Sequence, residues 1–153
     1  MTTAIRPQLA TGHIGLNVSD LDRSVDFYQR ALGFEQLAAS TDDNRRWAFL
    51  GADGKLMVTL WEQSDGAFST ETPGLHHLSF QVDTIEQVRS VEAVLRELAV
   101  NFAHEGVVAH GEGVASGGIF FADPDGIRLE VYAPTGAESA PAPTGAAPTC
   151  GFF

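Results

Sequence analysis

Two stretches of the chain repeat one pattern, and a histidine opens each copy, at positions 13 and 77. Residues 13–18 read His-Ile-Gly-Leu-Asn-Val, and residues 77–82 read His-Leu-Ser-Phe-Gln-Val. After each histidine, apolar residues alternate with small or polar ones, which predicts a strand with one face in a core and a polar face opposite. A segment with helical spacing follows each strand. Self-similarity at a fixed spacing indicates that the chain contains two copies of one structural unit.

The first copy, about residues 11–63, is expected to contain one helix and four strands. Its helix begins near Asp20, with Ser19 or Asp20 able to cap the first turn, and stops at Gly33. The pair Asp53-Gly54 predicts a two-residue hairpin turn between the last two strands. The expected strands are residues 13–18, 34–39, 46–50 and 56–61. The order of elements is therefore βαβββ.

The second copy, about residues 74–134, follows a linker that contains Gly and Pro, and it repeats the same order. Thr84 and Gln87 form a capping-box pattern at the start of its helix. Because the strands alternate rather than run continuously apolar, the sheet should pack one face on helices and present a concave, partly polar face. An α+β fold follows, with residues 1–134 as a single domain. The expected strands of the second copy are residues 77–82, 101–108, 117–122 and 127–132.

Charge and composition limit the partners of such a domain. The net charge of −11 argues against nucleic acid and anionic membranes, and it leaves neutral or cationic small molecules as ligands. The chain has one lysine and eight arginines, so a strongly anionic ligand would need a metal to meet it. Cys150 is the only cysteine, which excludes an intrachain disulfide. With neither a signal-type segment nor a run of about 18 apolar residues, a cytoplasmic location is expected.

Three residues on the polar faces are possible metal ligands. His13 and His77 open matching strands, and Glu130 lies on the corresponding face of the last strand. Two imidazoles and one carboxylate form a facial triad, which suits Fe(II) and leaves positions open for substrate or dioxygen. Mn(II), Zn(II) and Ni(II) are further candidates. The plainer alternatives are a hydrogen-bonding histidine at the edge of a strand for His77 and a surface ion pair for Glu130.

The sequence resembles the vicinal oxygen chelate superfamily, which holds glyoxalase I, bleomycin-resistance proteins, fosfomycin-resistance thiol transferases and extradiol ring-cleaving dioxygenases. The resemblance implies two paired βαβββ modules that form an open, cup-shaped mixed sheet around a divalent metal. It also implies a small-molecule substrate chelated through vicinal oxygens and, commonly, a homodimer. It covers about residues 11–134 and is carried by residues 13–21, 24–28, 32–34, 76–80 and 121–130.

One departure from the glyoxalase pattern concerns the number of ligands. The resemblance to glyoxalase I implies a fourth ligand, a glutamate in the last strand of the first module. Val58 or Thr59 stands at the corresponding position, and neither is a carboxylate. Glu62 is the nearest carboxylate, but it comes three or four residues late. A three-ligand metal is therefore favoured, with Glu62 as a possible fourth ligand.

A second departure concerns proton transfer. Extradiol dioxygenases carry an acid–base tyrosine before a Pro-Asp-Gly-like turn, where this chain has Phe120. Proton transfer would need another group, for which His110 in a Gly-rich loop is the candidate; the alternative is an ordinary loop histidine. Dioxygenase-like chemistry is favoured. The alternatives are a glyoxalase I-like isomerase (a lyase), a thiol transferase and, in another class, a metal-free drug-binding protein of bleomycin-resistance type.

The C-terminal tail, residues 135–153, differs from the rest of the chain. It is rich in Ala, Pro and Gly, a composition typical of linkers, yet it ends in Cys-Gly-Phe-Phe. Two terminal phenylalanines are costly to expose to water. The tail is therefore expected to lie on its own subunit or on a neighbour, or alternatively to help cover the concave site.

Overall fold

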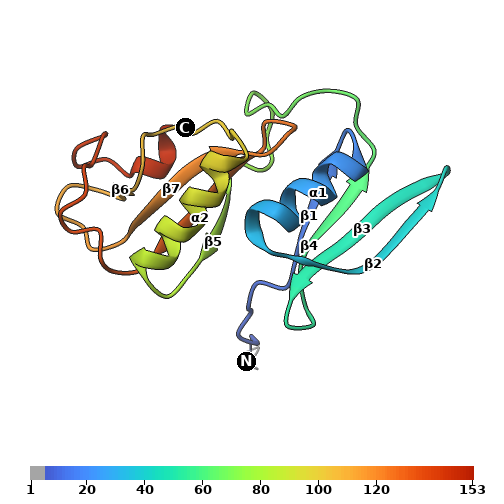
Figure 1. Ribbon diagram of the computed structural model, residues 1–153, viewed down its shortest axis with the longest axis horizontal. Coiled ribbons are helices and arrows are strands. Elements are labelled where there is room, and N and C mark those ends of the chain that lie inside the picture. The colour runs from blue at the N-terminus through green and yellow to red at the C-terminus, as the bar shows by residue number, and fades with distance from the viewer. Residues whose placement is uncertain (1–5) are drawn as a thin grey trace, which may run out of the picture.

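Two modules lie side by side in the computed structural model, which describes residues 6–153 (Figure 1). The first module has one sheet in the strand order β1-β4-β3-β2, with β1 parallel to β4 and the other neighbours antiparallel. The element bounds of this module are β1 (Ile14–Val18), α1 (Leu21–Leu32), β2 (Glu35–Asp42), β3 (Arg45–Ala52) and β4 (Lys55–Glu62).

The second module repeats this topology in its own sheet, in the strand order β5-β8-β7-β6, with β5 parallel to β8. The α+β fold of two βαβββ modules is thereby confirmed. A short 3₁₀ helix, η1 (Thr149–Gly151), follows in the tail. The element bounds of this module are β5 (Leu78–Gln81), α2 (Ile85–Glu97), β6 (Val108–Ala109), β7 (Gly117–Ala122) and β8 (Arg128–Ala133).

Both helices begin with caps that the sequence predicts, and α1 also ends at the predicted glycine. The Asp20 side chain accepts from the Arg23 N–H at the start of α1, and Gly33 ends that helix in the left-handed conformation (φ 71°). At the start of α2, Thr84 and Gln87 satisfy each other's backbone N–H groups in a capping box. Neither of these helices, nor any other within residues 6–153, is long and apolar enough to cross a membrane.

The alternating apolar residues of β1 and β8 lie between the sheet and the helix, as the alternation predicts. Leu16 and Val18 of β1 are buried under α1, and Leu129 and Val131 of β8 are buried under α2. We call this side of each sheet the helix face and the opposite side the open face. Removing these side chains from water supplies the main driving force for both modules.

The strand expected at 101–108 is largely absent, which corrects the sequence prediction. The chain makes an isolated bridge from Phe102 to Phe121 and then leaves the sheet. Gly106 turns the backbone at φ 65°, and only the two residues of β6 rejoin β7. The glycine in the left-handed region explains the interruption, because extended pairing cannot continue through that conformation.

The Asp123–Gly126 turn joins the two modules. Ser19 N–H donates to Asp125 Oδ2 (3.0 Å), and Arg23 Nη2 donates to Asp125 Oδ1 (2.9 Å). Tyr28 of α1, fully buried, donates its hydroxyl to Asp123 Oδ2 (2.9 Å). Burial raises the pKa of both Tyr28 and Asp123. In the sequence these residues indicate only a turn between two strands. In the structure the same turn holds the first module against the second.

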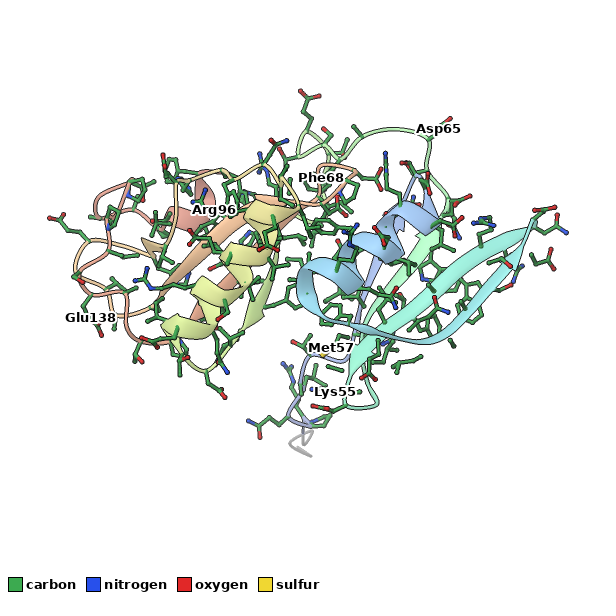
Figure 2. The ribbon with its side chains drawn as sticks, viewed as in Figure 1. Lys55, Met57, Asp65, Phe68, Arg96 and Glu138 are labelled. Atoms are coloured by element: carbon green, nitrogen blue, oxygen red, sulfur yellow. The ribbon has the colours of Figure 1, made fainter. Side chains whose placement is uncertain are left out.

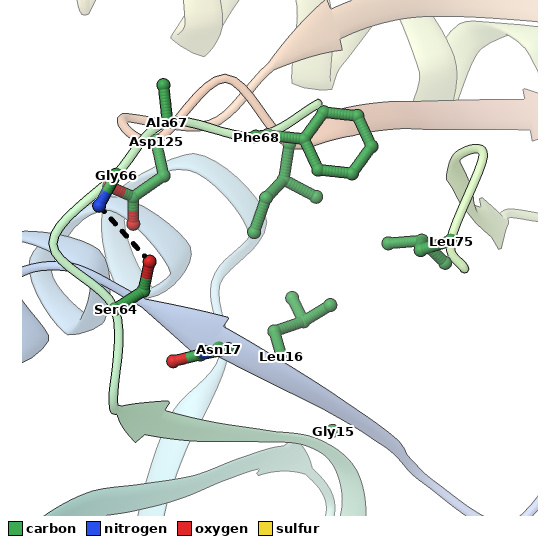
Figure 3. Close-up of a pocket in the computed structure, with 10 residues that line it drawn as sticks. Gly15, Leu16, Asn17, Ser64, Gly66, Ala67, Phe68, Leu75 and Asp125 are labelled. Carbon is green, nitrogen blue, oxygen red and sulfur yellow. Dashed lines mark hydrogen bonds between the residues drawn. The ribbon is translucent and has the colours of Figure 1, made fainter. Parts of the chain in front are cut away.

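The linker reinforces this seam between the modules. Phe68 lies there (Figure 2), and its N–H donates to the carbonyl of Asp125 (2.9 Å). Its neighbours include Leu16 of β1 and Leu75, which face the same pocket of about 190 Å³ (Figure 3). The pocket marks the seam, since it is bordered by β1, the linker and the Asp125 turn.

Candidate metal centre

Glu130 stands in the middle of the second sheet, on its open face. It lies opposite Ser79 of β5 and Phe120 of β7. His77, directly before β5, falls on the same face by the period of two. The open face would ordinarily be wet, yet only 3% of Glu130 is exposed. A carboxylate buried to this degree needs charged or hydrogen-bonding partners.

Two histidines supply those partners. His77 Nε2 lies 3.5 Å from Glu130 Oε2, and His110 Nε2 contacts Glu130 Oε1. The other ring nitrogen of His110, Nδ1, lies 2.8 Å from Ser116 Oγ, which fixes the orientation of the ring. His77 Nδ1 lies 2.8 Å from His76 Nδ1. Each carboxylate oxygen of Glu130 therefore faces an imidazole, and the other ring nitrogen of each imidazole contacts a further side chain.

Burial lowers the pKa of His77, and this outweighs the opposing effect of the Glu130 charge. A neutral imidazole has a free nitrogen lone pair, and this is the form that binds metals. His77 and Glu130, which the sequence offers as metal ligands, lie next to each other on the open face. His110, which the sequence offers as a proton carrier, joins them directly.

His13 lies elsewhere. It is exposed, it directly precedes β1 in the first sheet, and it falls on the open face together with Gly15 and Asn17. Within residues 6–153 of one chain, no group of three His, Cys, Asp or Glu side chains is arranged to hold a metal ion. One chain therefore brings together His77, His110 and Glu130, and leaves His13 on the other sheet.

The register decides which residue of the first module corresponds to Glu130. Thr59 pairs with Gly15 of β1 as Glu130 pairs with Ser79 of β5, so Thr59 rather than Val58 is the counterpart. Thr59 is buried, and its hydroxyl accepts from Trp61 Nε1 (3.0 Å). The first module offers no carboxylate at this place.

Glu62 lies at the end of β4 and faces the start of α1. Its Oε2 accepts from the Leu21 N–H (2.7 Å) and lies 3.3 Å from Arg46 Nε. The carboxylate thereby satisfies a backbone donor of the first helical turn, where negative charge is favourable. By the period of two, Glu62 shares the helix face with Val58 and Leu60, away from Thr59.

Aromatic residues occupy the open face of the first module instead. Trp47 and Phe49 of β3 lie beside Trp61 of β4, all three half-buried, with ring centroids 4.6 to 6.2 Å apart. The two modules thus present different open faces, one aromatic and one with imidazoles and a carboxylate.

The tail supplies contacts to the site that the sequence did not specify. The Phe153 ring lies 5.5 Å from the His77 ring and 5.2 Å from the Phe120 ring. Burial, together with the charge of Glu130, raises the pKa of the Cys150 thiol. The apolar end of an otherwise linker-like segment led the sequence analysis to offer two places for the tail, on a subunit surface or over the concave site; the Phe153 contacts agree with the second.

Comparisons with known proteins relate the domain to one protein family. The family model described as Glyoxalase/Bleomycin resistance protein/Dioxygenase superfamily matches residues 10–131. Catechol-2,3-dioxygenase of Bacillus subtilis is 30% identical over 134 residues; the match covers 86% of this chain but only 44% of that protein. The Arabidopsis thaliana protein named glyoxylase I 4 is 29% identical over 78% of this chain and 67% of its own length.

Solved structures share the fold over most of the chain. A glyoxylase/bleomycin resistance protein/dioxygenase domain from a Frankia species has a TM-score of 0.72 at 26% identity, covering 83% of this chain and 98% of its own. The fosfomycin resistance protein FosX of Listeria monocytogenes, solved with Mn(II) and sulfate, has a TM-score of 0.61 at 25% identity and covers 88% and 98%.

Proposed function

The chain belongs to the Glyoxalase/Bleomycin resistance protein/Dioxygenase superfamily, and from this we propose that it is a divalent-metal enzyme acting on a small substrate chelated through vicinal oxygens. The observation that carries the proposal is the burial of Glu130 between His77 and His110 on the open face of the second module. A buried carboxylate facing a neutral imidazole is a donor set suited to Fe(II) or Mn(II).

In this proposal His77 and Glu130 hold the ion and His13 of a second copy of the chain completes the triad. β1 and β5 are both edge strands, so each has one side without a strand neighbour among the described residues. Exposed edges favour pairing with another chain. A homodimer that sets the first module of one copy against the second module of its partner would bring His13 to the open face that carries Glu130.

His110 has the position of a proton carrier in this proposal. Ser116 holds its Nδ1 side (2.8 Å), and its Nε2 faces Glu130. Its ring lies 5.2 Å from that of Tyr132 and 6.2 Å from that of Phe120. Phe120 itself has no proton to transfer, and it supplies an apolar wall that excludes water.

A bound divalent ion would supply Lewis-acid polarisation of substrate oxygens. Among the reactions of the superfamily we favour dioxygenase-like chemistry. Thr59 at the counterpart of Glu130 leaves the triad without a carboxylate as fourth ligand, which keeps more positions open. The identity to a catechol dioxygenase supports the same choice, although this chain spans less than half of that protein. Glyoxalase-type isomerisation and thiol transfer are the alternatives.

The test begins with elemental analysis of protein purified without chelator, followed by titration with Fe(II), Mn(II), Zn(II) and Ni(II). We expect about one ion per site, and loss of binding in His77→Ala. Oxygen uptake with a panel of catechols is then compared with a methylglyoxal–thiol assay. Turnover in the methylglyoxal–thiol assay alone would indicate an isomerase and not a dioxygenase. Oxygen uptake that survives in His77→Ala would show that the activity comes from another site.

A second candidate is metal-free binding of a cationic aromatic compound. It is favoured by the cluster of Trp47, Phe49 and Trp61 on the open face of the first module and by the net charge of −11. The face of an aromatic ring attracts cations, and it also attracts other flat rings. The binding-protein proposal would be favoured over the enzyme if no divalent metal copurifies or binds on addition while a cationic aromatic dye quenches the tryptophan fluorescence.

A further inference from the structure

The C-terminal tail has an anchored part and a tip. The anchored part, residues 137–149, is bound to residues 107–116 by main-chain hydrogen bonds: Ala137 N to Ala115 O, Ala109 N to Pro141 O, Glu112 N to Gly145 O and Thr149 N to His110 O, each 2.9 Å. Thr149 is fully buried, and its hydroxyl also donates to the carbonyl of Ala109 (2.7 Å). The anchored part behaves as an additional layer of the second module.

The tip, Phe152 and Phe153, is held differently. Phe152 is 56% exposed, while the ring of Phe153 packs on the site. That ring lies 5.5 Å from the His77 ring and 5.2 Å from the Phe120 ring, and the Arg128 guanidinium carbon lies 5.6 Å from its centre. Ring contacts of this kind are individually weak and can be exchanged for those of a ligand.

The tail also lies beyond the part of the chain shared with the superfamily. The family model ends at residue 131, and the Frankia domain is covered to 98% while matching only 83% of this chain. The tip thus lies outside the residues that the family model matches and beside His77.

We propose that the C-terminal tail is a strap whose tip closes the site: Phe153 plugs the His77–Glu130 end of the open face, and a ligand must displace it. This inference rests on the proposed function in naming His77 and Glu130 as the ligand's destination. The anchored part keeps Phe153 close to the site at high effective concentration, so the plug recloses after each displacement. The strap therefore sets how readily a ligand gains access.

The chain contains its own reporters of the closed state. Cys150, the single cysteine, is half-buried between the Thr149 anchor and the tip. Lifting the tip bares the ring of His77; it also loosens the turn that holds the thiol, because the Phe152 N–H donates to the Thr149 carbonyl across Cys150 (3.1 Å). The rate of thiol reaction with dithionitrobenzoate and the rate of His77 modification by diethyl pyrocarbonate, read by peptide mass, both measure opening in metal-free protein.

Phe153→Ala is compared with Phe152→Ala, which changes the neighbouring, exposed phenylalanine and serves as the matched control. We expect Phe153→Ala to raise both rates about tenfold, the effect of losing roughly one aromatic pair, and Phe152→Ala to leave them within about twofold. Far-UV circular dichroism verifies that both variants keep the fold. Equal rates in the two variants and the wild type would overturn the strap.

Mn(II) separates this inference from the proposed function. If Mn(II) binds, its association should be faster in Phe153→Ala than in Phe152→Ala, and its addition to the wild type should accelerate thiol reaction. Faster modification in Phe153→Ala without any Mn(II) binding would retain the strap and reject the metal enzyme. Mn(II) binding at one rate in all three proteins, with unchanged thiol reaction, would retain the enzyme and reject the strap.

Discussion

The two modules share a backbone plan and differ in what their open faces offer. At one register position the second module has Glu130, between two histidines and under the tail, and the first has Thr59, beside an aromatic cluster. The first module contributes one exposed histidine, His13. The comparison teaches that a repeated unit fixes where chemistry can be placed, while each copy's own residues decide which chemistry is placed there.

The largest expected effect distinguishes the two register positions. Glu130→Gln removes the only carboxylate of the proposed donor set, and metal affinity should fall by at least about 100-fold, since even residues behind a ligand cost 10- to 100-fold. Thr59→Val, the matched change in the first module, should leave the affinity within about threefold. Isothermal titration with Mn(II) measures both. Similar losses in the two variants would mean that the modules do not divide the roles in this way.

The second prediction tests whether the modules of different chains cooperate. His13→Ala and His77→Ala should each abolish metal binding, and mixing the two variants under subunit exchange should restore about one site per mixed dimer. A site within one chain would stay empty in the mixture, because every chain lacks one ligand. Metal content after mixing, with the dimer quantified by light scattering, gives the answer.

The third prediction concerns the turn that joins the modules. Asp125→Ala leaves Ser19 and Arg23 without their acceptor, and the free energy of unfolding should fall by about 2–3 kcal/mol, as expected for a buried acceptor with several donors. The control, Asp26→Ala, breaks an exposed pair with Arg30 (3.4 Å) and should cost less than about 0.5 kcal/mol. Urea unfolding measures both variants. Equal small losses would show that the turn does not hold the modules together.

The smallest effect is the pH dependence that arises at the same turn. Burial raises the pKa of Asp123, so the folded state binds this proton more tightly than the unfolded chain. The resulting stabilisation is complete below the unfolded pKa, about 3.9, and is lost as pH rises through the raised folded pKa. Asp123→Asn removes the titrating group, so its stability relative to the wild type should increase with pH in that window. Urea midpoints between pH 4 and pH 7 measure this; a constant difference would contradict it.

Most of the fold could be read from the sequence because it depends on local rules. Alternation of period two assigned the faces of β1 and β8, and the Asp20 cap, Gly33 and the Thr84–Gln87 box set the bounds of the helices. The segment at 101–108 failed because Gly106 turns the chain out of the sheet, and an apolar run alone does not report that φ angle. Local patterns thus gave the elements, except where one glycine overrode them.

The sequence by itself determined that His77 and Glu130 share the polar face of one copy and that His13 lies on the matching face of the other; it left Val58 and Thr59 open as the counterpart of Glu130. Only the tertiary structure decided that His110 meets Glu130, that Glu62 caps α1 instead, and that Phe153 covers His77. The physical reason lies in the range of the interactions. A strand's period is fixed by its own backbone geometry, whereas a loop or tail reaches its partner through packing between segments far apart in the chain, which no local spacing encodes.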